Sequence, residues 1–271
     1  MITSMTITDQ IRGSAPFVYE GDFAAGVRQA AQLGYDGVEL HLADPDRADR
    51  EGLAGALKDH GVVLTAVGTG RAYVNDGLSI TDPDPVGRQA AVARLERFLA
   101  FAGQFGAKII VGCMRGNAAS PDELPATLER LGQSMEHLDR IAGNEGVSVV
   151  FEPINRYENN FLCTMAEISG FIQACGLRHT GLLADTFHMN IEEADLFASI
   201  RANAANIQYV HVADSNRRYP GQGHLPVAAV LKELHAAGYE GVLSAECLPW
   251  PGKEEAAAGW LHAVKAITAS F

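Results

Sequence analysis

The sequence predicts a (β/α)8 barrel, in which eight parallel strands close into a ring and helices connect them. Two observations carry this prediction. Short β-branched apolar runs alternate with longer alanine-rich amphipathic stretches along the whole chain, and we count eight such units. No G-x-G-x-x-G fingerprint follows the first predicted strand, which favours a closed barrel over an open dinucleotide-binding sheet.

The individual elements follow from the local pattern. The predicted strands are Met5–Asp9, Gly37–His41, Val62–Val67, Lys108–Gly112, Ser148–Glu152, Gly181–Asp185, Gln208–His211 and Val242–Glu246. Apolar residues at three- and four-residue steps predict helices that include Asp22–Leu33, Pro85–Phe105, Asp122–Asn144, Met165–Ala174, Val227–Ala237 and Glu254–Ala269. A glycine before an apolar or aromatic residue predicts left-handed helix caps at Gly34, Gly61, Gly106, Gly146 and Gly238.

The composition favours one domain spanning residues 1–271. The chain is 47% hydrophobic, enough for one large core, and no Gly/Ser/Pro linker or charge block divides it. A formal net charge of −12 would repel phosphate backbones, so we expect no nucleic-acid partner.

The cellular setting is predicted from what the sequence lacks. The start has no basic segment followed by an apolar one, and no apolar run reaches about 18 residues, so we expect neither export nor a membrane partner. The four cysteines form no C-x-x-C pair, and we interpret them as reduced thiols of a cytoplasmic protein.

The residues that close the later strands are unusually polar. Strands 5 to 8 end in Glu152, Asp185, His211 and Glu246. Because the carboxyl ends of barrel strands meet at one mouth, these side chains should converge, and buried carboxylates would repel one another without a cation. Taken singly, each acid could instead be solvated or cap the next helix, but four consecutive strands ending this way indicate a shared site. Glu39, which ends strand 2 with His41, is expected either to hydrogen-bond in the mouth or to be structural.

Three carboxylates and one imidazole suit a hard or borderline cation. We therefore expect one divalent metal ion, Mn²⁺ first, with Co²⁺ or Mg²⁺ as alternatives.

Four segments carry a family resemblance. FEPINRYENN (151–160), LLADTFHMNIEEAD (182–195), YVHVADSNRRYPGQGH (209–224) and SAECLPWPG (244–252) resemble the ketose 3-epimerase group of the xylose-isomerase-like TIM-barrel family. GTGRAYVNDGLSITDPD (68–84) also fits, so the resemblance covers nearly the whole chain.

The resemblance implies roles for individual residues. Glu152, Asp185, His211 and Glu246 would ligate the metal, and Glu152 and Glu246 would also be the acid/base pair. Glu158, His188 and Arg217 would contact a small sugar or sugar-acid substrate. The implied reaction inverts a carbon beside a ketone, with one base on each face and an enediolate between them. If these residues had no role in substrate binding, His188 would form hydrogen bonds only with the backbone, and Arg217 would be a solvent-exposed loop residue.

Two arginines depart from the pattern of free-ketohexose members of the group. Arg115 stands after strand 4 where those members carry an aromatic residue, and Arg71 lies in GTGRAY. Guanidinium groups bind planar carboxylates in bidentate fashion, so we expect a keto-sugar acid such as 5-keto-L-gluconate or tagaturonate. A phosphate would be accepted by the same charges, and both arginines could instead pair with rim acids.

Other functions remain open at this stage. An aldose–ketose isomerase resembling hydroxypyruvate isomerase, or an inosose dehydratase, would use the same metal site. A DNA-repair endonuclease would need more histidine ligands and a basic surface, and a non-catalytic barrel would not need the glutamate pair. We also expect a possible homo-oligomer, dimer or tetramer, with Trp250 and Trp260 as exposed interface candidates.

Overall fold

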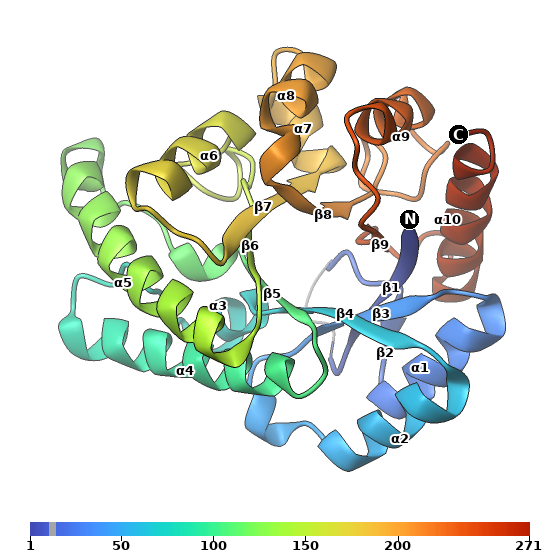
Figure 1. Cartoon of the computed structure of the whole chain (residues 1–271), viewed down its shortest axis with the longest axis horizontal. Helices are drawn as coiled ribbons and strands as arrows, with labels where there is room; N and C mark the ends of the chain where they lie inside the picture. Colours follow the sequence, from blue (N-terminus) through green and yellow to red (C-terminus); the bar gives the residue numbers. More distant parts are fainter. Residues whose placement is uncertain (11–14) are drawn as a thin grey trace. The chain divides into compact units, whose positions relative to one another are not determined.

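The computed structural model of the protein describes residues 1–10 and 15–271 (Figure 1). Within these residues the strands are β1 (Ile2–Thr8), β2 (Tyr19–Glu20), β3 (Gly37–His41), β4 (Val63–Gly68), β5 (Lys108–Val111), β6 (Val149–Phe151), β7 (Thr180–Asp185), β8 (Ile207–His211) and β9 (Val242–Ala245). They form one sheet in the order β2-β1-β3-β4-β5-β6-β7-β8-β9, and β1 also pairs in parallel with β9. The pairing of β1 with β9 closes a ring of eight strands, so the predicted (β/α)8 barrel is confirmed.

Helices connect the strands. They are α1 (Phe23–Leu33), α2 (Arg50–His60), α3 (Gly70–Asp76), α4 (Pro85–Gly103), α5 (Leu124–Glu145), α6 (Met165–Ala174), α7 (Thr186–Glu192), α8 (Leu196–Asn203), α9 (Val227–Ala236) and α10 (Lys253–Thr268). The predicted strands and the named helices lie within three residues of the observed bounds. The short helices α3, α7 and α8 and the two-residue strand β2 were not predicted, because elements this short have little periodicity.

By internal packing the chain divides into two compact units, and the prediction of a single domain stays a prediction. The first unit comprises Met1–Leu40, Asp49–Thr65 and Leu183–Phe271. In it, α1 packs beside α2, and α10 contacts α9 and β9 (Figure 1). Ser4 of β1 lies opposite Ser244 of β9, and His211 of β8 also lies opposite Ser244.

The core of the first unit buries one of the two tryptophans, which corrects an expectation. Trp260 of α10 has no exposed surface, stacks on Tyr35 and donates a hydrogen bond from Nε1 to the carbonyl of Val212 at 2.7 Å. Trp260 therefore cannot be the exposed interface residue that we expected. Trp250 is 45% exposed, and the Arg218 guanidinium lies 3.6 Å from its ring centre.

The second unit comprises His41–Ala48 and Ala66–Leu182. In it, the second half of β4, the strands β5 and β6, and the first half of β7 pair in parallel, with Val111 of β5 opposite Phe151 of β6. Helices α4 and α5 lie side by side in this unit (Figure 1). The register places the end of β6, and so Glu152, directly beside the end of β5.

The glycine caps confirm the predicted helix ends. Gly34, Gly61 and Gly146 are C-caps with φ of 92°, 64° and 67°, and each donates its N–H to carbonyls of the preceding turn. Gly106 and Gly238 also have positive φ, but Gly106 lies two residues beyond the cap of α4 and Gly238 lies one residue beyond the cap of α9. A left-handed backbone is unfavourable for residues with a Cβ, so these glycines set where each helix turns into the next strand.

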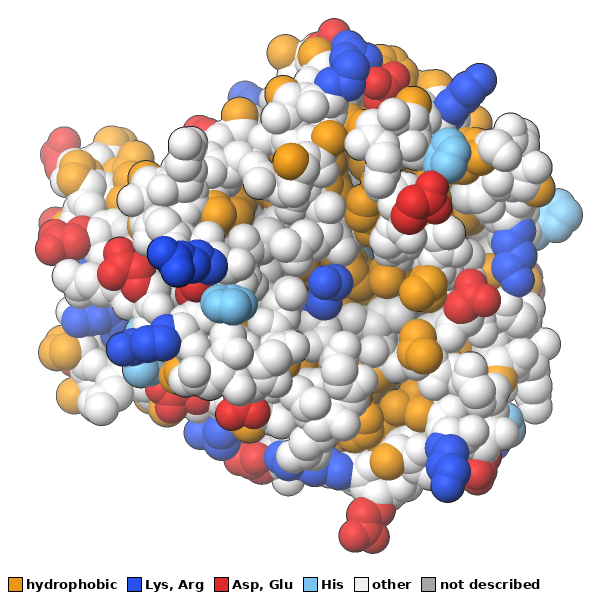
Figure 2. All heavy atoms as spheres, in the orientation of Figure 1, with side chains coloured by type: hydrophobic (Ala, Val, Ile, Leu, Met, Phe, Trp, Pro, Cys, Tyr) orange, Lys and Arg blue, Asp and Glu red, His pale blue; other side chains and the backbone are white. Residues whose placement is uncertain are grey.

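The composition bears on the charged surface and on the four cysteine thiols. Basic and acidic side chains are interspersed on the face drawn in Figure 2. The cysteines Cys113, Cys163, Cys175 and Cys247 are all free thiols. Burial raises the pKa of the Cys247 thiol, and the neighbouring Glu246 adds to this, so Cys247 stays protonated.

Among the described residues, no helix combines the length and the apolar character needed to cross a bilayer.

Candidate metal centre

Three of the four predicted ligands lie together in the first unit. Strand β7 ends on Asp185, β8 ends on His211, and Glu246 follows the last residue of β9. Side chains alternate along a strand, and His211 lies opposite Ser244, so Glu246 projects to the same face as His211. All three residues are buried.

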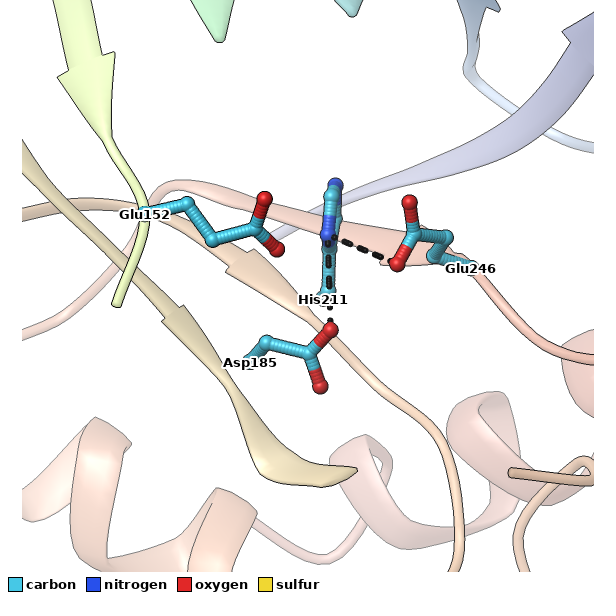
Figure 3. A group of neighbouring side chains, drawn as sticks. All are labelled: Glu152, Asp185, His211 and Glu246. Atoms are coloured by element: carbon cyan, nitrogen blue, oxygen red, sulfur yellow. Dashed lines mark ion pairs between the residues drawn. The ribbon is translucent and has the colours of Figure 1, made fainter. Parts of the chain in front are cut away.

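The imidazole of His211 lies between the two acids. Its Nδ1 is 3.4 Å from Oε2 of Glu246 and 3.7 Å from Oδ2 of Asp185, as the dashed lines in Figure 3 mark. Glu152, which directly follows β6 in the second unit, is the fourth member of this buried group. Each of the four residues offers one ligand atom, and the four atoms lie within 4.8 Å of one another. These are the four residues that the strand ends indicated, and their role as metal ligands stays a prediction.

A hydrogen bond decides which nitrogen of His211 carries the proton. Nε2 lies 3.0 and 3.2 Å from the two carboxylate oxygens of Glu39. An ionised carboxylate only accepts hydrogen bonds, so Nε2 is the donor. In a neutral imidazole, Nδ1 then turns a lone pair toward Asp185 and Glu246. One proton on Nδ1 would offset a single negative charge of the surrounding carboxylates, whereas a divalent cation would offset two.

The two oxygens of Asp185 have different partners. Oδ1 accepts hydrogen bonds from the backbone N–H groups of Phe187 at 2.7 Å and His188 at 3.4 Å, which caps the start of α7. Oδ2 is buried and makes no hydrogen bond within the described part of the chain. Such an oxygen is costly to leave unsatisfied, and a metal ion would compensate it. Helix capping therefore accounts for Oδ1 of Asp185, whereas Oδ2 is suited to coordinate a metal ion.

The donor set fits a divalent cation. Carboxylate oxygens and an imidazole nitrogen are ligands of Mn²⁺, Mg²⁺, Co²⁺ and Zn²⁺, and the site has no thiolate that would select a softer ion. The buried carboxylate and histidine cluster could hold a metal, and the geometry does not distinguish among these ions.

Two predicted substrate residues border the cluster within the first unit. His188 is buried, with Nε2 3.7 Å from Oδ2 of Asp185. Nη2 of Arg217 lies 3.4 Å from Oε2 of Glu246, and its guanidinium lies 4.8 Å from the ring centre of Phe187. Arg217 has a φ of 60°, which is uncommon for a residue with a side chain.

The loop that carries Arg217 is organised by Asp214, which sequence analysis did not single out. Its carboxylate accepts backbone hydrogen bonds from Ser215, Gly221 and Leu225 at 2.7–3.0 Å. Burial alone would raise the pKa of Asp214, but these bonds and one from Gly223 outweigh it and lower the pKa below its ordinary value. The loop is therefore tied to one buried, ionised carboxylate.

In the second unit, Arg115 is fully buried and holds the backbone at Glu152. Its Nη1 donates to the Glu152 carbonyl at 2.6 Å, and its Nε donates to Oδ1 of Asn159 at 3.0 Å. The guanidinium lies 5.7 Å from the ring centres of Phe151 and Phe161. Burial lowers the pKa of Arg115 to about 10, so it is still charged at neutral pH.

The remaining predicted residues also lie in the second unit. Glu158 is exposed, and its Oε1 accepts a hydrogen bond from Nδ2 of Asn155 at 3.1 Å. Arg71 is buried in α3. Their substrate contacts, and that of Arg115, stay predictions.

Tyr209 is a further residue that sequence analysis missed. Its hydroxyl donates to Oε2 of Glu39 at 2.8 Å. Burial raises the pKa of Tyr209, and the Glu39 carboxylate raises it further, so the hydroxyl keeps its proton. Two-residue alternation from His211 could have placed Tyr209 on the same face, but only the fold brings Glu39 to it.

Comparison with known proteins identifies the family to which the chain belongs. The sequence profile of the xylose isomerase-like TIM barrel family matches residues 27–264. A ketose 3-epimerase of Arthrobacter globiformis is 31% identical, over 84% of this chain and 80% of the relative. An L-ribulose 3-epimerase of Mesorhizobium japonicum is 33% identical, over 79% of this chain and 72% of the relative. The solved structure of a 3-keto-D-glucoside 4-epimerase from E. coli, in its apo form, superposes with a TM-score of 0.79 and 25% identity, over 97% of this chain and 99% of that one.

Proposed function

Because the chain belongs to the xylose isomerase-like TIM barrel family, we propose that it is a divalent-metal-dependent epimerase that inverts a carbon next to the ketone of a ketose or keto-sugar acid. The observation that carries the proposal is the buried cluster in which Nδ1 of His211 faces the carboxylates of Asp185 and Glu246. The similarity to named epimerases supports the assignment to the isomerases.

The names of the relatives point to one shared chemistry. A ketose 3-epimerase acts at a carbon next to a C2 ketone, and a 3-keto-glucoside 4-epimerase acts at a carbon next to a C3 ketone. In both cases the inverted carbon is adjacent to the carbonyl, so its hydrogen is acidic. We infer that the present site performs the same kind of inversion.

The roles of the residues follow from this chemistry. One of Glu152 and Glu246 removes the proton from one face of the carbon, and the other returns a proton on the opposite face. After one turnover the first glutamate is protonated and the second ionised, so both exchange with solvent before the next. Asp185 and His211 would hold the metal together with the two glutamates, and the bound metal would stabilise the negative charge that develops on the ketone oxygen. Arg217 and His188 would orient substrate hydroxyl groups.

The substrate, the preferred ion, the location and the oligomeric state are further proposals, each with its own support. A keto-sugar acid such as 5-keto-L-gluconate, with the chain as a 5-keto-L-gluconate epimerase, rests on Arg71 and Arg115 in the second unit. Mn²⁺ as the preferred ion rests on the carboxylate and imidazole donor set, the cytoplasmic location on the cysteine pattern, and a homo-oligomeric state on the family resemblance.

The test is metal-restored exchange of substrate hydrogen. The protein is stripped with a chelator, Mn²⁺, Co²⁺ or Mg²⁺ is added back, and solvent deuterium entering 5-keto-L-gluconate, tagaturonate, fructose and tagatose is followed by NMR. We expect metal-dependent deuterium at the carbon beside the ketone, together with the epimer. An aldose product would instead indicate an isomerase, and a product that has lost water would indicate a dehydratase.

Matched variants assign the two bases. Glu152→Gln and Glu246→Gln should each lower interconversion by about 10²–10⁴-fold, because each removes one of two proton-transfer groups. Each variant should exchange the proton of only one epimer, since the remaining glutamate reaches one face. Asp185→Asn serves as a control that weakens the metal site while leaving both glutamates. If both glutamine variants exchanged both epimers at the parental rate, the two-base proposal would be wrong.

A further inference from the structure

A chain of buried hydrogen bonds leads from the interior of the first unit to the candidate metal centre. Oγ of Ser4 lies 2.7 Å from Oγ1 of Thr65, which lies 2.8 Å from the hydroxyl of Tyr209. Tyr209 donates to Glu39 at 2.8 Å, and Glu39 accepts from Nε2 of His211 at 3.0 Å. All five residues are buried, and Glu39 and His211 have no exposed surface.

The hydrogen bonds of this chain converge on one carboxylate. Glu39 can only accept, so both Tyr209 and His211 donate to it. The single Tyr209 proton is then committed to Glu39. The Thr65 hydroxyl, whose one proton lies within reach of both the Val38 carbonyl at 2.9 Å and the Tyr209 oxygen at 2.8 Å, is not needed to fix this direction. With these hydrogen-bond directions, His211 is protonated on Nε2 and presents Nδ1 toward Asp185 and Glu246.

A structural role alone does not account for a carboxylate at this position. Taking an ionised glutamate out of water costs several kcal/mol, and an uncharged side chain of the same volume is often equally stabilising or more so. Hydrogen bonds from a carboxylate to the outer nitrogen of a metal-binding histidine, by contrast, fix the ring orientation and tautomer and make the coordinating nitrogen more basic.

We propose that Glu39 is a positioning residue of the metal centre, which holds His211 in the tautomer that can bind the ion, and that Tyr209 in turn holds Glu39. The inference rests on the proposed function, because it requires that His211 ligates a metal. Glu39 does not need to touch the substrate or the ion to act in this way.

The first measurement is metal affinity rather than turnover. Mn²⁺ is titrated by calorimetry into the chelator-stripped protein and its variants. Glu39→Gln should bind Mn²⁺ about 10–100-fold more weakly than the parent, as is usual when the outer partner of a ligating histidine is removed. Tyr209→Phe keeps the ring and the carboxylate, so it should weaken binding by a smaller factor. Asp36→Asn is the matched acid-to-amide control. Asp36 directly precedes β3, the strand that carries Glu39, and its carboxylate accepts hydrogen bonds from the backbone N–H and the hydroxyl of Thr3 rather than from His211.

Two further readouts separate positioning from a structural role. In the metal-free protein, ¹⁵N NMR should show His211 protonated on Nε2, and Glu39→Gln should lose this preference. Urea denaturation without metal should show that Glu39→Gln is no less stable than the parent. A variant that loses metal affinity only in proportion to lost stability would indicate a structural role and overturn the inference.

The outcomes also separate the inference from the proposed function. A parent protein that binds Mn²⁺, beside a folded Glu39→Gln variant that binds it equally well, would overturn the inference alone. A parent protein that binds none of Mn²⁺, Co²⁺ and Mg²⁺ would overturn the proposed function and the inference together.

Discussion

The role of Arg115 depends on which acceptors its guanidinium N–H groups reach. Its position in the sequence suggested recognition of a substrate carboxylate. In the fold, two of its donors are used by the Glu152 carbonyl and the Asn159 side chain, and two aromatic rings flank it. This geometry favours a role in fixing the backbone that carries Glu152.

Replacing Arg115 should therefore affect stability. Arg115→Met would leave two buried acceptors without their donor, and each such loss costs about 1–3 kcal/mol, so we expect the free energy of unfolding in urea to fall by about 2–6 kcal/mol. The exposed Arg28→Met variant is the control and should stay within about 0.5 kcal/mol of the parent.

Kinetics of the milder Arg115→Lys variant separate positioning from recognition. Positioning predicts that kcat/KM falls by a similar factor for a keto-sugar acid and for a neutral ketose. A loss confined to the keto-sugar acid would show instead that Arg115 binds the substrate carboxylate.

At the scale of an element, the loop after β8 depends on Asp214. Backbone N–H groups from both ends of the loop converge on this carboxylate, and the loop carries Arg217 to Glu246. The loop is thus an ordered part of the site rather than a loose connection.

This arrangement predicts a pH dependence with a definite sign. The folded-state pKa of Asp214 lies below its ordinary value of 3.8, so its stabilising contribution is complete above that value and is lost as the pH falls below it. Asp214→Asn should lower the free energy of unfolding by about 1–2 kcal/mol at pH 7, since an amide replaces one acceptor by a donor. The difference between the two proteins should shrink as the pH drops below about 4. Urea denaturation from pH 7 to pH 3 measures it, and a difference that stays constant would contradict the assignment.

At the scale of the whole molecule, a metal that binds only the folded protein must stabilise it. At a free Mn²⁺ concentration 100 times Kd the gain is about 2.7 kcal/mol. For a chain of this size we expect Tm to rise by about 5–10 °C relative to the protein in chelator. Differential scanning calorimetry tests this, with Asp185→Asn as the variant that should show little response. An equal rise in parent and variant would place the stabilising ion elsewhere.

The sequence by itself determined the architecture and the four residues of the candidate metal centre. Apolar runs of strand length alternate with helical periods, and this order favours a closed parallel sheet. In such a sheet all strands end at the same mouth, so the polar residues that end β7 and β8 and directly follow β6 and β9 were expected to approach one another. Glycine caps could be predicted for a similar reason, because a positive φ is a local property of the backbone.

Only the tertiary structure decided how individual side chains are used. Trp260 and Arg115 lie in polar or amphipathic segments, yet neighbours that are distant in sequence bury them completely. The link from Tyr209 to Glu39 and His211 joins residues about 170 positions apart, and no local pattern indicates it. Strand ends are set by periodicity, which is local, whereas burial and hydrogen-bond partners depend on packing between segments that the linear sequence does not place together.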